Sequence, residues 1–97
     1  MPRVTVLCWQ EIPSAVEAAE GRQRHKLQLS PRFMELIDAA AMRRKLSGAD
    51  DYLAHWRREP RGEREGTPEA VATAVAAEIE AAYEAIRAAA LANGPAQ

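Results

Sequence analysis

His55 is the side chain of this sequence best suited to acid–base chemistry, because an unperturbed imidazole changes its charge near neutral pH. Asp51 stands four residues before it and Glu59 four residues after it, so one continuous helix would place all three on a single face. Such a set could bind a metal ion, but at 1.5 Å of rise per residue it would spread over about 12 Å, too far for one ion. Pro60 also favours a helix end before Glu59. We therefore interpret His55 as a solvated surface histidine and predict no metal site.

Cys8 and two tryptophans are the other side chains with a chemistry of their own. A nucleophilic cysteine needs partial exposure and a nearby base, but Cys8 alternates with two valines in an apolar run, which indicates a buried thiol. Trp9 and Trp56 could stack on a base or on a cofactor ring. Trp9 ends the same apolar run and Trp56 shares an expected stripe with Leu53, so both are predicted to lie wholly or partly in the core. We predict no catalytic residue and no cofactor.

The densest local charge follows Gly21, in the string Arg22, Arg24, His25 and Lys26. An acidic partner or a phosphate could bind there, and the expected helix start at Ser30 would add backbone N–H donors. A plain solvated edge is the alternative. The candidate partner-binding surface joins this string to the cations after Trp56, and it consists of Arg22, Arg24, Lys26, Arg57 and Arg58.

Length and composition indicate one small domain. The chain has 97 residues, 47% of them apolar but only 5% aromatic, so we expect a small core. The net charge of −1 hides an asymmetry. Residues 22–64 carry eleven Lys and Arg against six Asp and Glu, whereas the two ends are acidic. The basic middle could attract a partner, or the acidic last helix of the chain could cover it.

Several classes of function lack their signatures. The sequence has no glycine-rich phosphate loop, no H-E-x-x-H and no G-x-S-x-G, which does not favour an independent enzyme. A pI near 6.1 with few aromatics does not favour nucleic acid. A single cysteine excludes an internal disulfide and fits a reducing compartment. Without a signal-peptide pattern or a long apolar run, we expect a cytoplasmic protein with no membrane contact.

Hydrophobic patterning predicts an α+β fold in which a small N-terminal β-hairpin packs against three α-helices in a single domain, residues 1–97. The hairpin spans residues 3–20, with a strand at Arg3–Trp9 and a turn at Ile12-Pro13. The segment from Ser14 to Ala19 is ambiguous, because its alanines and glutamates favour a helix. A lone first strand needs a partner for its backbone groups, and this argument favours the hairpin.

Three helices and a loop complete the expected fold. The first helix spans residues 31–47, with Ser30 as N-cap and Gly48 as C-cap. The second spans residues 50–58, capped by one of the two aspartates at its start, with Tyr52, Leu53 and Trp56 facing inward. A polar loop covers 59–66. The third helix spans 67–93, and its small-residue face could form a homodimer.

Three segments resemble the small bacterial family of "virulence factor" domain proteins: VLCWQEIPSAV, QLSPRFMELIDAAAMR and DDYLAHWRR. The resemblance covers roughly residues 4–58. Relatives carry a tyrosine-tryptophan-arginine triplet where this chain has Cys8-Trp9-Gln10. After the first proline they are more apolar and β-branched than this chain, which supports the hairpin.

The family name describes a phenotype, and the resemblance transfers no catalytic residue. Attachment of the domain to scaffold-like modules implies a non-enzymatic interaction module that docks on a larger cytosolic protein. Members that look to be encoded beside folate- and corrinoid-dependent methyl-transfer proteins imply an alternative, an accessory subunit in one-carbon metabolism. A small anion- or RNA-binding protein is the third hypothesis.

Overall fold

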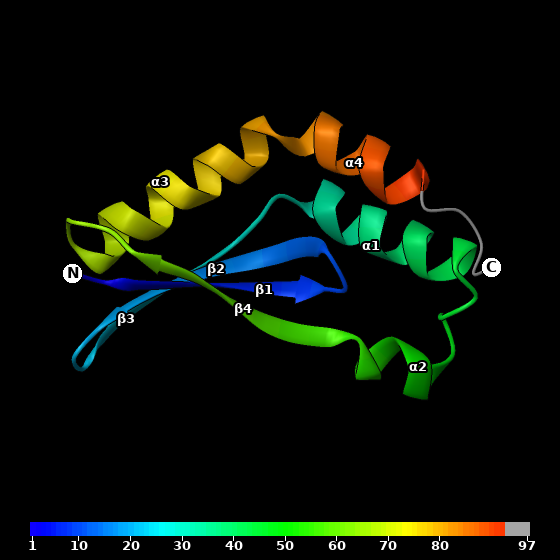
Figure 1. Cartoon of the computed structure of the whole chain (residues 1–97), viewed down its shortest axis with the longest axis horizontal. Coiled ribbons are helices and arrows are strands. Elements are labelled where there is room, and N and C mark those ends of the chain that lie inside the picture. The colour runs from blue at the N-terminus through cyan, green and yellow to red at the C-terminus, as the bar shows by residue number, and fades with distance from the viewer. Residues whose placement is uncertain (93–97) are drawn as a thin grey trace.

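Four antiparallel strands form one sheet in the computed structural model, which describes residues 1–92. The strands are β1 (Arg3–Trp9), β2 (Ile12–Glu20), β3 (Gln23–Gln28) and β4 (Trp56–Glu63), and their order in the sheet is β3-β2-β1-β4. Three helices, α1 (Pro31–Arg43), α3 (Pro68–Ala81) and α4 (Tyr83–Ala92), lie over one face of this sheet (Figure 1). The α+β class is confirmed.

The N-terminal hairpin is confirmed, and tertiary packing explains why its second arm is not helical. Val16 pairs with Val6 and Ala18 with Val4, and all four side chains are buried. This burial outweighs the helix propensity of the alanines. The turn was predicted at Ile12-Pro13 but lies at residues 10–11, where Gln10 has a φ of 52°, and Ile12 already pairs with Trp9.

The sheet has a third strand that the sequence analysis did not predict. β3 pairs with β2 along its whole length, after a turn at Gly21 in the left-handed region at φ 60°. β3 is an edge strand, and Leu27 is its one side chain packed against the main core. Because the other positions face solvent or the rim, no apolar alternation marks this strand in the sequence.

The predictions of a helix at 50–58 and a loop at 59–66 were wrong. Helix α2 covers only Ala49–Ala54, and its N-cap is Gly48, with both aspartates in the first turn. At Trp56 the chain enters β4, which pairs with the free edge of β1. Pairing satisfies the backbone of β1, and Pro60 is tolerated because β4 is an edge strand with an irregular register near it.

The helix layer follows the predicted starts more closely than the predicted ends. Helix α1 ends at Arg43 instead of residue 47, so Gly48 is not its C-cap. The predicted helix 67–93 is interrupted at Ala82, and residue 93 lies outside the described residues. The bend lets α3 pack on β2 and β3 while α4 packs on α1 (Figure 1). None of the described helices is long and apolar enough to cross a membrane.

The buried apolar side chains form two clusters. One lies between the central strands and α3 and contains Val6, Val16, Phe33 and Val75. The other joins α1, α4 and the hairpin turn through residues that include Trp9, Ile12, Ile37, Ala40 and Ala90. Trp9 stacks on Tyr52 at 5.8 Å and donates its indole N–H to the Tyr52 carbonyl at 2.8 Å, which holds α2 against the end of the sheet. Leu53 was predicted to face inward but is 66% exposed.

Candidate functional site

The sheet has a face that α1, α3 and α4 do not cover. Val4, Val6, Val16 and Ala18 point to the helices and belong to the core. Since strand side chains alternate, their neighbours Thr5, Leu7, Glu17 and Ala19 point the opposite way. Residues that are paired across neighbouring strands lie on the same face of the sheet. The strand register therefore shows which residues of β3 and β4 lie on this uncovered face.

Cations surround a carboxylate on this face. Lys26 is paired with Glu17, Arg24 with Ala19, and Arg58 with Leu7, while Arg3 lies on the same side two residues before Thr5. Glu63 lies opposite Arg3, so four cations face two carboxylates. We call this set the basic sheet face; its charged members are Arg3, Glu17, Arg24, Lys26, Arg58 and Glu63.

Glu17 links the two edges of the basic sheet face. Its side chain is only 18% exposed, and Oε1 accepts from Arg58 Nη2 at 2.7 Å and lies 3.6 Å from Arg24 Nη1. Those arginines stand on β4 and β3, three strand spacings apart, which is roughly 14 Å. A single carboxylate therefore holds two guanidinium groups over the middle of the sheet, and both remain more than half exposed.

The structure brings together three of the five predicted partner-binding residues. Arg24, Lys26 and Arg58 lie on the basic sheet face, and Arg22 lies in the exposed β2–β3 turn beside it. Arg57 does not belong to it. Adjacent residues in a strand point to opposite faces, and Arg57 donates Nε to the Gln10 carbonyl at 2.8 Å and Nη2 to Glu59 at 3.1 Å.

Sequence reasoning missed three members of the basic sheet face: Arg3, Glu17 and Glu63. Charged side chains at alternate positions of residues 22–28 and 56–63 indicate a shared face of a sheet. This pattern can be interpreted only when both segments are recognised as strands. Without these strands, the sequence shows that cations occur at residues 22–26 and 57–58 but does not show how they are arranged in space.

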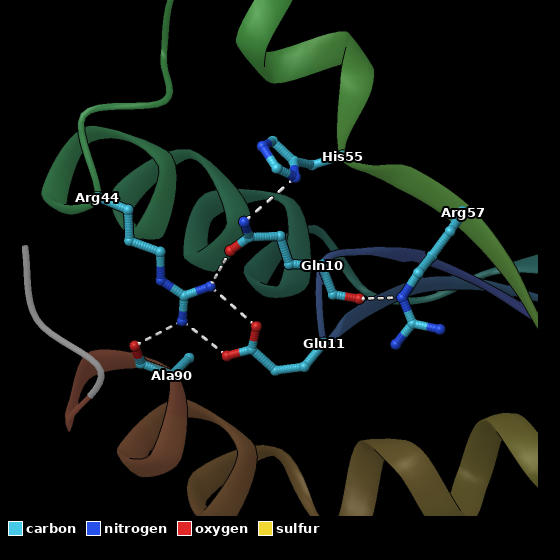
Figure 2. A network of polar contacts seen from close by, with 6 residues as sticks. All are labelled: Gln10, Glu11, Arg44, His55, Arg57 and Ala90. Atoms are coloured by element: carbon cyan, nitrogen blue, oxygen red, sulfur yellow. Dashed lines mark hydrogen bonds and ion pairs between the residues drawn. The ribbon is translucent and has the colours of Figure 1, made fainter. Parts of the chain in front are cut away.

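A buried arginine fixes the hairpin turn beside this site (Figure 2). Arg44 is 7% exposed and donates to Glu11 through both Nη atoms, at 2.8 and 2.6 Å, to the Gln10 side chain, and to the Ala90 carbonyl at 2.9 Å. The Gln10 backbone N–H donates to the His55 carbonyl at 2.9 Å. The network thus joins α1, α4 and the start of β4 to the hairpin turn.

The acid–base candidates are not assembled into a reactive site. His55 is the C-cap of α2 and half-buried, not freely solvated. Its Nδ1 lies 3.3 Å from Gln10 Nε2, and its ring makes a T-shaped contact with the Trp9 ring. Glu59 lies in β4, where hydrogen bonds from Arg61 and Arg57 outweigh burial and lower the pKa of its carboxyl. The helical face that would join His55 to Glu59 and Asp51 does not exist. Within residues 1–92, no cluster of three metal-ligating side chains occurs.

The predictions for Cys8 and the tryptophans are confirmed. Cys8 and Trp9 are fully buried, and Trp56 is half-buried against Tyr52. Burial raises the pKa of the Cys8 thiol, and Glu59 raises it further, which disfavours the reactive thiolate.

Comparison with known proteins gives a family and no closer relative. No curated protein and no solved structure matches the chain. The model of the family described as "Virulence factor" matches residues 7–92, which include the hairpin turn, both tryptophans and every helix of the described structure. This chain belongs to the virulence factor family.

Proposed function

We propose that the protein is a non-enzymatic interaction module that docks on an acidic surface of a larger protein through the basic sheet face. The observation that carries the proposal is the excess of two positive charges on an uncovered sheet face, with Arg24 and Arg58 oriented by Glu17. Surface arginines that are held in place lose less conformational entropy on binding than mobile ones. Each guanidinium can also donate two parallel hydrogen bonds to one carboxylate of the partner.

Complementary charge chiefly accelerates association and selects the partner, and salt screens it. The apolar middle of the face, Thr5, Leu7 and Ala19, can contribute contact area once the partner excludes water. Docking is therefore expected to weaken steeply with salt but to retain a salt-resistant component.

RNA is disfavoured as the occupant of this face. Single-stranded nucleic acid is bound by aromatic rings between the cations, and the positions around Glu17 carry Thr5, Leu7 and Ala19 instead. Trp9 is buried beneath α2 and is not available for stacking. Retention on heparin at physiological salt together with a saturable RNA shift would contradict the proposal.

The test uses the tagged full chain and a charge-reversed variant, Arg24→Glu/Lys26→Glu/Arg58→Glu. Proteins that copurify from lysate at low salt and leave at moderate salt are identified by mass spectrometry, and the strongest one is purified for binding measurements. The matched control is Arg43→Glu, which reverses an exposed cation on α1. We expect the triple variant to raise Kd at least tenfold and the control to change it less than twofold. Equal binding by the triple variant would exclude this face.

The identity of that partner also addresses the one-carbon hypothesis. A folate- or corrinoid-dependent methyl-transfer protein whose activity depends on this chain would support the accessory-subunit alternative. The homodimer through the last helix is tested separately, by the sedimentation mass of the pure protein at high concentration.

A further inference from the structure

A recess lies on the side of the sheet opposite the basic sheet face, where the helix layer stops short of β4. Helix α3 packs on β2 and β3 and helix α1 packs on β2. Beside them a groove of about 370 Å³ remains, between β1 and β4 on one side and α3 and α4 on the other. Its apolar lining consists of Val4, Pro13, Val75, Ile79, Ala82 and Ile86.

The bend at Ala82 shapes this groove. Helix α3 ends there and α4 begins one residue later, so the apolar side chains of both helices meet at an angle above β1. An unbroken helix would carry Ile86 further along the α3 axis. The recess is therefore built from backbone geometry and not from a missing side chain.

Four charged residues line the groove: Glu11, Arg61, Arg64 and Glu78. Arg44 donates to both carboxylate oxygens of Glu11. Arg64 donates both Nη atoms to Glu78, at 2.7 and 2.6 Å, and this pair is complete. Arg61 donates only Nε, to Glu59 at 2.5 Å, and Glu59 also accepts from Arg57. Two arginines thus share one carboxylate, and within residues 1–92 the two Nη atoms of Arg61 have no protein acceptor.

We infer that this groove binds a peptide segment of a partner protein in which an apolar side chain stands next to an aspartate or glutamate. The apolar side chain enters between Ile79 and Val4, and the carboxylate accepts from the two Nη atoms of Arg61. That contact supplies the second anion to the row Arg57–Glu59–Arg61, and a bidentate guanidinium–carboxylate pair has the required planar geometry.

A peptide is favoured over a small molecule because the groove is a recess along an edge strand. The outer edge of β4 has no neighbouring strand within residues 1–92, so its backbone groups are available to a chain lying beside it. This site is separate from the basic sheet face, which lies across the sheet, and neither proposal depends on the other.

The experiment selects binders from a phage-displayed library of random 12-residue peptides, using the full chain as bait. The tightest sequence is synthesised and its Kd is measured by fluorescence polarisation. We expect the selected peptides to share an apolar residue beside Asp or Glu. Arg61→Glu and Ala82→Trp, which fills the groove from the exposed C-cap of α3, should each raise Kd at least tenfold.

The controls separate the groove from general effects. Ala81→Trp adds the same ring at a neighbouring exposed position that does not line the groove, and it should change Kd less than twofold. Arg58→Glu, on the basic sheet face, should also leave binding unchanged. If Ala82→Trp fails to fold by circular dichroism, Arg61→Glu carries the test, because its side chain is exposed. The inference would be overturned if the selection gave no peptide with a Kd below 1 mM, or if neither groove variant changed the Kd. It would also be overturned if the groove bound decanoate, a probe for fatty acids, and no peptide.

Discussion

Arg44 is a side chain whose structural role exceeds anything its surroundings in the sequence indicate. It lies in a run of three cations, Arg43, Arg44 and Lys45, yet it alone of these is buried. A guanidinium is removed from water at a high free-energy cost unless it is fully hydrogen-bonded, and here Glu11 and Ala90 supply the acceptors. Its Nε has no partner within the described chain, so the network is held mainly through the two Nη atoms.

Replacing Arg44 by methionine should destabilise the protein by about 2–4 kcal/mol, because the Ala90 carbonyl loses its donor and Glu11 loses its ion pair with Arg44. Urea denaturation measures the free energy of unfolding. The control is Arg43→Met, an exposed neighbour, which should change it by less than about 0.5 kcal/mol. Equal effects of both substitutions would show that the buried network contributes no net stability.

Glu80 links the stability of the fold to pH. Burial raises the pKa of its carboxyl, but hydrogen bonds from the backbone N–H of Ser30 at 2.6 Å, from the Ser30 hydroxyl at 2.8 Å and from Arg32 at 3.0 Å outweigh burial and lower it. Ser30 was predicted to cap α1 with its side chain, and it donates to Glu80 instead. A carboxyl whose pKa is lower in the folded state stabilises above its ordinary value of about 4.5, and this stabilisation is lost as pH falls through the lowered value.

Glu80→Gln should therefore reduce stability at pH 7 but flatten its decline below about pH 5. The measurement is the midpoint of urea unfolding at a series of pH values from 7 to about 3. Glu84→Gln, at an exposed position of α4, is the matched control and should leave the slope of the wild type unchanged. A wild-type slope in Glu80→Gln would contradict the assignment.

At the scale of the elements, the segments predicted from the sequence are those whose buried apolar residues recur at the spacing of a strand or a helix, or whose start carries a capping signal. The strand at 3–9 and the starts of the helices at 31 and 68 have apolar stripes or cap-then-proline signals, and they were found within a residue. β3 and β4 were missed because edge strands bury few side chains and are specified by the partner strand, information that a local pattern does not contain. The basic sheet face was accordingly predicted as a set of cations without an arrangement.

Amide hydrogen exchange tests the reassignment of residues 56–63. In an edge strand, alternate N–H groups point to the neighbour and the rest point to solvent. We expect slow exchange at every second amide of β4 where it pairs with β1, and fast exchange between them. Uniformly fast exchange would indicate a loop, and uniform protection through residue 58 would restore the helix.

At the scale of the whole molecule, docking is expected to raise the stability of the fold measurably, because a chain of 97 residues has a small core and modest stability of its own. A partner that binds only the folded state stabilises it by about 1.4 kcal/mol at a free concentration of ten times Kd. For a domain of this size that corresponds to a rise in Tm of roughly 6–11 °C.

The partner identified by copurification should produce this rise in the wild type and in Arg43→Glu, measured by calorimetry with the partner's own transition subtracted. Arg24→Glu/Lys26→Glu/Arg58→Glu should show little rise, and 0.5 M NaCl should reduce the wild-type rise, since salt screens the exposed arginines. A full rise in the triple variant would place the partner on another surface, and the groove variants Arg61→Glu and Ala82→Trp would then show whether that surface is the groove.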